Sequence, residues 1–220
     1  MHEQQLNLPL GLPGSAPIWD AAVLETLAEL NEQLLQRLCR LASLERPAPL
    51  LRALLPQWRA LDAAACRALA QGPVLLLDAG LAEPARWHLL SASGVQDADV
   101  GPSGNLYFAD GAGIALLRRV LVLAWHLARA NPLAGRVALG MSGPCAMRLA
   151  CCRLDELERL AEGRPEWIRP RWEARPDIWQ PLLEAALQPE RPALRHLRWR
   201  GVQLLAASLQ AAEQEGGRGR

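Results

Sequence analysis

Three of the five cysteines are close together in the sequence, at Cys145, Cys151 and Cys152. Thiolate sulfur serves as a metal ligand and as a nucleophile, so this cluster is the first candidate for chemistry. A structural zinc site usually presents paired ligands such as Cys-x-x-Cys, often with histidines, and no such pair occurs. Adjacent Cys151 and Cys152 would point to different faces of a helix. We therefore expect small buried thiols and no metal site.

The histidines are the next candidates, because histidine is the commonest general base. His88 and His126 each follow a tryptophan, but no nucleophile and acidic partner can be assigned to either. The segment 97–105 contains acidic residues and glycines, as ion and phosphate loops do. It lacks the P-loop lysine and the calcium-loop spacing, so a flexible linker is the simpler interpretation. We expect neither catalysis nor a bound cofactor.

Arginine, tryptophan and proline alternate through the segment "RPEWIRPRWEARPDIW", residues 164–179. Prolines near helix starts would force short turns, and indoles would fill the angles between helices. The arginines could form a surface for nucleic acid or a protein partner. Alternatively, their stems lie over the indoles and their charges face solvent. The candidate binding residues here are Arg164, Arg169, Arg171, Trp172 and Arg175.

A second basic segment, "RPALRHLRWR", spans residues 191–200. Its candidate binding residues Arg191, Arg195 and Arg198 are spaced to share one helical face. No acidic residue occurs between Glu190 and Glu213. The formal net charge is only +1, so DNA binding would need such a local patch. A phosphate backbone, an acidic protein surface or solvent would each suit this face.

Helical periodicity must position these side chains. From residue 19 to 44, leucines recur at spacings of three, four and seven, and Asp20 is a suitable N-cap. The segment 73–81 is ambiguous between a short strand and a helical turn, and 83–92 is expected to be a short helix. We predict an all-α fold. Further helices are expected at 50–58, 61–72, 113–130, 143–152, 155–163, 176–187 and 192–212.

The chain divides at its glycine-rich and polar stretches. Its expected parts are a flexible N-terminus (1–17), an N-terminal helical half (18–93), a linker loop (94–112), a C-terminal helical half (113–212) and a disordered tail (213–220). Pro73, Pro84, Trp87 and Leu90 match Pro165, Pro176, Trp179 and Leu182 at a constant offset of 92. We predict two duplicated halves packed as a pseudo-dimer, with chance agreement in a repetitive composition as the alternative.

The stretch 141–165 is expected to form two short helices with a bend. Ser142 can cap the first helix, Asp155 can cap the second with Glu158 three residues later, and Gly163 can end it. Helix-turn-helix proteins share this shape. The second helix is acidic, however, so it is a poor candidate for entering a groove of DNA. The arginine segments that follow are better candidates for any contact with DNA.

Residues 116–185 resemble the flagellar transcriptional regulator FlhD. The likeness rests on a long apolar helix, the pair Leu139–Gly140 and a helix with the pattern L-x-x-L-x-x-L-A. That pattern is formed by Leu154, Leu157, Leu160 and Ala161. FlhD-like proteins are small, helical and dimeric, and they activate transcription with the zinc-containing partner FlhC. The resemblance implies a non-enzymatic helical activator in transcription regulation. It would act in an FlhC-like complex, with DNA-binding direct or through the partner, and it could form a homodimer.

Localisation can also be predicted from the sequence. The N-terminal residues lack a cationic start and an apolar core, so we expect a cytoplasmic protein with reduced cysteines. Arg118 and Arg119 interrupt the apolar run 113–130, which favours a buried helix over a membrane span. The alternative function is a cytoplasmic adaptor or accessory protein of a secretion apparatus, recognised through helical surfaces.

Overall fold

Helices account for nearly all regular structure in the computed structural model, which describes residues 20–84, 86–87, 107–108, 110–188 and 190–218. The all-α prediction is therefore confirmed. Within the described residues, the only strands are β1 (Leu77–Asp78) and β2 (Arg169–Pro170), and the ambiguous segment 73–81 contains the first of them. Both strands are too short to define a sheet layer.

The N-terminal half contains α1 (Ala21–Leu41), α2 (Pro49–Ala53), α3 (Leu55–Ala60) and α4 (Ala63–Ala70). Asp20 caps α1 as predicted, since its carboxylate accepts a hydrogen bond from the N–H of Ala22 at 3.1 Å. Asp62 caps α4 in the same way, through the N–H of Ala65 at 2.6 Å. Of the leucines whose spacing predicted this helix, Leu27, Leu34 and Leu38 are buried, and Leu24 and Leu41 are partly buried. Leu30 and Leu35 are buried beside them.

The C-terminal half contains α6 (Gly111–Ala130), α7 (Pro132–Leu139), α8 (Gly143–Cys151), α9 (Leu154–Gly163), the 3₁₀ helix η1 (Pro165–Trp167), α10 (Pro176–Leu187) and α11 (Leu194–Arg218). Ser142 caps α8 as predicted, although its hydroxyl lies 3.4 Å from the N–H of Cys145. Helix α9 ends at Gly163, also as predicted.

Several element boundaries differ from the sequence-based expectations. Helix α7 was not predicted, although Asn131 caps it through the N–H of Ala134 at 3.1 Å. Helix α9 begins at Leu154, and its first turn is fixed by Glu156, which accepts a hydrogen bond from the N–H of Arg153 at 2.8 Å. The predicted cap at Asp155 is therefore wrong. Helix α11 begins at residue 194 rather than 192 and continues to residue 218, through most of the expected disordered tail.

The end of the predicted linker is anchored to α1. Tyr107 and Phe108 are buried, and the guanidinium of Arg37 donates a hydrogen bond to the carbonyl oxygen of Tyr107 at 2.6 Å. The same guanidinium lies over the Phe108 ring and forms a 2.9 Å ion pair with Asp110. Residues 94–106 of the predicted linker lie outside the described residues, as do residues 85 and 88–92 of the helix predicted at 83–92, whereas Pro84, Arg86 and Trp87 are helical.

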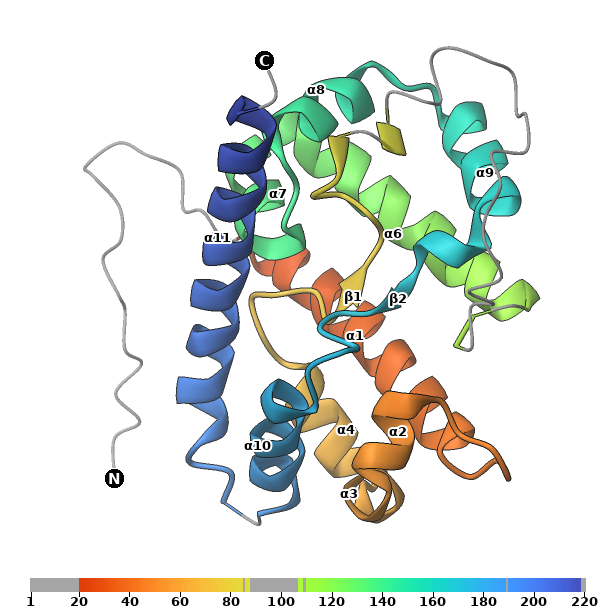
Figure 1. Ribbon diagram of the computed structural model, residues 1–220, viewed down its shortest axis with the longest axis vertical. Helices are drawn as coiled ribbons and strands as arrows, with labels where there is room; N and C mark the ends of the chain where they lie inside the picture. The colour runs from red at the N-terminus through yellow and green to blue at the C-terminus, as the bar shows by residue number, and fades with distance from the viewer. Residues whose placement is uncertain (1–19, 85, 88–106, 109, 189, 219–220) are drawn as a thin grey trace.

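The short strand pair lies near the middle of the molecule (Figure 1). In this view α6, α7, α8 and α9 lie above it, α2, α3, α4 and α10 lie below it, and α11 runs along one side. Helix α1 packs against α4, and α6 packs against α7, α8 and α9. One continuous hydrophobic core includes side chains from both halves.

Helix α6 is the central helix of the upper group. Among the described residues it is the one helix long and apolar enough to cross a membrane by length and composition, and half of its apolar window is buried in this structure. Its other face carries Arg119, which forms a 2.9 Å ion pair with Glu29 of α1. In this fold one apolar face of α6 packs against protein, while Val122 on the opposite side is 40% exposed.

The strand pairing follows the sequence offset between the two halves. The strands are antiparallel, with Leu77 opposite Pro170 and Asp78 opposite Arg169. The offset of 92 residues relates Leu77 to Arg169 and Asp78 to Pro170. Each strand residue therefore pairs with the counterpart of its neighbour, which is the reciprocal pattern that a two-fold axis produces.

Two further features repeat at or next to the same offset. Gly80 and Trp172 both have positive φ angles, of 68° and 55°. The indoles of Trp87 and Trp179 both donate their N–H to a carbonyl oxygen in the preceding turn, that of Gly80 at 3.0 Å and that of Arg171 at 2.8 Å, so the donors match at offset 92 and the acceptors at offset 91. The offset noticed in the sequence thus coincides with matching backbone and side-chain geometry.

Gly140 ends α7 in the left-handed region, with φ of 67°, at the place where α11 packs on α7. A Cβ atom there would lie 2.6 Å from Cδ1 of Leu205 and 3.1 Å from Nη1 of Arg171. We expect Gly140→Ala to lower the free energy of unfolding by about 1–3 kcal/mol, because it adds backbone strain to overpacking. Urea unfolding followed by circular dichroism would measure this loss.

Gly163→Ala is the matched control. No atom lies within 4 Å of a Cβ built at Gly163, and the residue is the last of α9. We expect this variant to be neutral or stabilised by about 0.4–1 kcal/mol, because alanine restricts the unfolded chain. Equal losses in the two variants would contradict the role of Gly140.

Candidate functional site

The predicted arginine and tryptophan surface does not exist as one surface. Arg171 is buried, with 7% of its surface exposed, and its guanidinium donates to three main-chain carbonyl oxygens. These belong to Leu75 at 2.8 Å, Leu77 at 2.7 Å and Leu139 at 2.9 Å. The side chain therefore joins the β1 segment to the end of α7, and it is unavailable to a nucleic acid or a protein partner.

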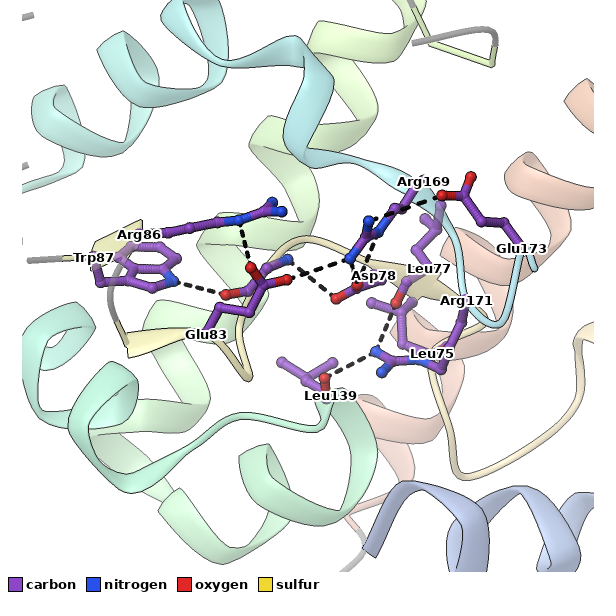
Figure 2. A network of polar contacts seen from close by, with 11 residues as sticks. Leu75, Leu77, Asp78, Glu83, Arg86, Trp87, Leu139, Arg169, Arg171 and Glu173 are labelled. Atoms are coloured by element: carbon purple, nitrogen blue, oxygen red, sulfur yellow. Dashed lines mark hydrogen bonds and ion pairs between the residues drawn. The ribbon is translucent and has the colours of Figure 1, made fainter. Parts of the chain in front are cut away.

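Arg169 lies beside it in the polar network of Figure 2. Its guanidinium donates twice to Asp78, at 3.0 and 3.1 Å, and once to Glu83 at 3.3 Å. Glu173 lies 3.8 Å away on the other side. Glu83 also pairs with Arg86 at 2.6 Å. Acidic side chains thus occupy the hydrogen-bonding groups that Arg169 would need for a phosphate.

The charges of this network shift the pKa values of its members. Burial alone would raise the pKa of Asp78, but the neighbouring Arg171 and Arg169 hold that pKa below its ordinary value. Burial raises the pKa of Glu173, and the Asp78 charge adds to that effect against the pull of Arg169. The network contains three carboxylates and three guanidinium groups, so its charges balance. The network therefore holds the two strands and the segments beside them together, and we call it the internal clamp.

Two other predicted residues point inward beneath α11. Trp172 and Arg198 line a small cavity of about 30 Å³ between α11 and the turn at 72–76. The guanidinium of Arg198 donates a hydrogen bond to the carbonyl oxygen of Ala68 in α4, and burial lowers the pKa of Arg198. The cavity is large enough for about one or two water molecules. These two side chains therefore attach α11 to the core.

Three further predicted arginines bind groups close to them in the sequence. Arg164 is partly buried and lies 3.8 Å from Glu166. Arg175 is exposed and forms a two-bonded ion pair with Asp177, at 2.7 and 2.8 Å. Arg191 precedes α11 with a φ of 48°, and it donates a hydrogen bond to the carbonyl oxygen of Ala186 at 3.0 Å. The expected shared face of Arg191, Arg195 and Arg198 is therefore wrong, because only Arg195 among them is exposed on α11.

The exposed part of the second basic segment is narrower than predicted. Arg195, His196, Trp199 and Arg200 are exposed on the first turns of α11, with 39% of the Trp199 surface accessible. No ion pair joins Arg195 or Arg200 to another described residue. We call these four residues the α11 face. They combine positive charge with an exposed indole, a composition enriched in protein interfaces.

Sequence reasoning missed several of these residues. Trp199 and Arg200 lie within the basic segment 191–200. A tryptophan among the arginines of a helix could have indicated a binding face. Asp78 ends the apolar run "VLLLD", and a single carboxylate beside a buried run signals a buried partner. Asn31 gave no such signal within α1, yet its buried amide bonds the backbone at residues 70, 74 and 76.

The thiols and histidines form no metal site within the described part of the chain, where no group of three His, Cys, Asp or Glu side chains could hold an ion. Cys66 and Cys145 are buried as expected, whereas Cys151 is exposed. His126 is exposed on α6, and His88 lies outside the described residues.

No protein-family model matches the sequence, and neither a curated protein nor a solved structure matches it.

Proposed function

We propose that this protein is a non-enzymatic helical adaptor that binds another protein through the α11 face. The observation that carries the proposal is the exposed Trp199 flanked by Arg195 and Arg200, which lack an ion-pair partner among the described residues. Tryptophan and arginine are the residue types that contribute most often to binding hot spots. An acidic protein segment with an apolar side chain would match this face.

The internal use of the other arginines favours a protein partner over DNA. Of the eight predicted binding residues, Arg169 and Arg171 belong to the clamp, while Trp172 and Arg198 line the cavity. Strong DNA binding depends on several phosphate contacts, each from an available cation. Two exposed arginines and one histidine are a small set for this purpose.

We infer that the two halves arose by duplication and pack as a pseudo-dimer. The offset of 92 relates the strands, the two positive-φ residues and the two indoles that donate to the preceding turn. With this offset the second unit ends at α10, so α11 follows it and lies outside the repeat. An appended helix is a suitable place for a binding face that the paired units do not share. An experimental structure in which residues 77–87 and 169–179 fail to superpose would contradict this.

The second candidate is a FlhD-like role in transcription regulation, with activation through a complex. The basic α11 face supports it too, because the same cations could contact phosphates beside a partner that reads the DNA. This candidate includes an FlhC-like protein partner, DNA and a homodimer. It shares with the adaptor proposal a cytoplasmic setting and the absence of catalysis.

Affinity capture would separate the two candidates. We expect tagged full-length protein to recover structural or export components of a secretion apparatus from the cells that make it. Reversing two charges with Arg195→Glu/Arg200→Glu should lower this recovery about tenfold or more, since such a loss corresponds to one disrupted hot spot. Quantitative mass spectrometry of the captured proteins would measure the ratio.

The control is Arg153→Glu/Arg159→Glu at the N-cap and in the body of α9, which lies across the molecule from α11 (Figure 1). Both arginines are exposed, at 80% and 68% of the side chain, so the control makes the same charge change. Recovery of transcription machinery, together with salt-sensitive binding to promoter DNA, would instead support the second candidate. Equal losses in both double variants would contradict the α11 face as the binding site.

A further inference from the structure

Two cysteines far apart in the sequence meet between α1 and α4. The Sγ atoms of Cys39 and Cys66 lie 3.9 Å apart, and 27 positions separate the residues in the chain. Cys66 is 4% exposed and Cys39 is partly exposed. A small oxidant can therefore approach from the side of Cys39, while the rest of the pair is enclosed by protein.

The packing of the two helices holds these sulfur atoms together. Helix α1 packs along α4, and the carboxylate of Asp62 fixes the start of α4 one turn before Cys66. A disulfide requires the sulfur atoms to approach to about 2 Å, which is within the reach of side-chain rotation when both residues face the same interface. The 3.9 Å sulfur–sulfur contact would therefore have to shorten by about 2 Å for a bond to form.

The neighbouring groups make the two thiols unequal. The two thiols share a hydrogen bond in which either sulfur can be the donor. With Cys39 as the donor, this bond lowers the pKa of Cys66, against opposing effects from burial, Asp62 and Glu32. Donation of this bond, with burial, raises the pKa of Cys39. In that arrangement Cys66 is the more easily ionised member of the pair, and a thiolate is the form that reacts with oxidants.

We propose that Cys39 and Cys66 are an intramolecular redox pair that forms a disulfide when the protein meets a hydroperoxide. The Cys66 thiolate attacks the terminal oxygen of the peroxide, which forms an S–O bond and breaks the O–O bond. The leaving alkoxide takes a proton and departs as an alcohol, or as water when the oxidant is hydrogen peroxide. Cys39 then attacks the sulfenic sulfur, and the second oxygen leaves as water. Two thiols and one hydroperoxide thus give one disulfide, one alcohol and one water.

The other cysteines lack this arrangement. Burial raises the pKa of Cys145 to about 11, and burial also raises the pKa of Cys152, whose thiol donates to the carbonyl oxygen of Arg148 at 3.3 Å. Cys151 is exposed. No second pair of sulfur atoms in hydrogen-bond contact occurs among the described residues. The intramolecular disulfide should therefore be specific to residues 39 and 66.

The test is peroxide treatment of the purified full-length protein, followed by alkylation, digestion and mass spectrometry. We expect a cross-linked peptide pair that contains Cys39 and Cys66, has lost two hydrogen atoms and disappears on treatment with a dithiol reductant. Because this disulfide would close a 27-residue loop between packed helices, we expect the Tm to rise by roughly 5–10 °C on oxidation.

Variants in which one cysteine is replaced by serine provide the controls. Cys39→Ser and Cys66→Ser should each abolish the cross-link and the rise in Tm, while Cys151→Ser should retain both. Recovery of residues 39 and 66 as alkylated or over-oxidised peptides, without a cross-link, would overturn the proposal. A dominant disulfide between two chains through Cys151 would overturn it as well.

Discussion

Replacement of Arg171 by methionine should lower the free energy of unfolding by about 3–5 kcal/mol, the range found when one member of a buried charged network is removed. Methionine retains much of the side-chain volume but has no hydrogen-bond donors. Three buried carbonyl oxygens, of Leu75, Leu77 and Leu139, would then lose their partner. Each unsatisfied buried acceptor costs about 1–3 kcal/mol, and the three costs overlap because one side chain supplies all the bonds.

The loss of Arg171 should also change the response to acid. Asp78 has a lowered pKa in the folded protein, so it contributes stability above its unfolded pKa, and this contribution disappears as the pH falls through the folded pKa. Without the Arg171 charge, the folded pKa of Asp78 should rise toward the unfolded value. Acid unfolding of Arg171→Met should therefore begin at a higher pH than that of the wild type.

Urea unfolding at neutral pH, followed by tryptophan fluorescence, would measure the loss. Arg171→Lys should be destabilised less, because it keeps the charge while losing the planar fork that reaches several carbonyls. Arg175→Met is the matched control, since Arg175 is exposed and pairs only locally with Asp177. A stable Arg171→Met protein, with an unfolding curve like that of the control, would contradict the role of the clamp.

Replacement of Trp179 by alanine is the second change with a large expected effect, also about 3–5 kcal/mol. Trp179 is fully buried in α10, and its ring centroid lies 5.4 Å from that of Trp58 in α3. Its indole N–H also holds the carbonyl oxygen of Arg171 at 2.8 Å. The change would remove the contact between α10 and α3 and would release the turn that positions the clamp.

Thermal and urea unfolding would measure this loss, with Trp199→Ala as the matched control. Trp199 is 39% exposed on α11, so we expect its removal to change stability by about 0.5 kcal/mol or less. The same control should weaken binding to a protein partner, which separates folding from recognition. If Trp179→Ala unfolded like Trp199→Ala, the assignment of Trp179 to the core would be wrong.

The two large effects should not add. Trp179 binds the carbonyl group of the residue whose guanidinium forms the clamp, so each change disturbs the structure that the other removes. We expect the double variant to lose less stability than the sum of the single losses, by about 0.5–3 kcal/mol. Its low stability would require measurement of the double-mutant cycle at low temperature or with a stabilising osmolyte.

The sequence by itself determined the helices and their buried faces. Leucine spacing in α1 specified a buried stripe because a helix repeats every 3.6 residues, and local caps such as Asp20 and Ser142 fixed helix starts through hydrogen bonds a few residues away. Helix α7 escaped detection because Pro132 and Gly135 lie within eight residues, too few to establish a period. Such local interactions are readable because both partners lie close together in the chain.

The tertiary structure alone decided which arginines are available. Arg171, Arg195 and Arg198 are the same residue type in similar local sequence, yet one forms an internal clamp, one faces solvent and one lies against α4. The carbonyl partners of Arg171 and Arg198 lie from 32 to 130 positions away in the chain and are brought close only by packing. A guanidinium group can donate hydrogen bonds to buried carbonyls and to exposed ligands equally well. The sequence therefore indicates that an arginine will donate hydrogen bonds, but only the fold decides which acceptor it meets.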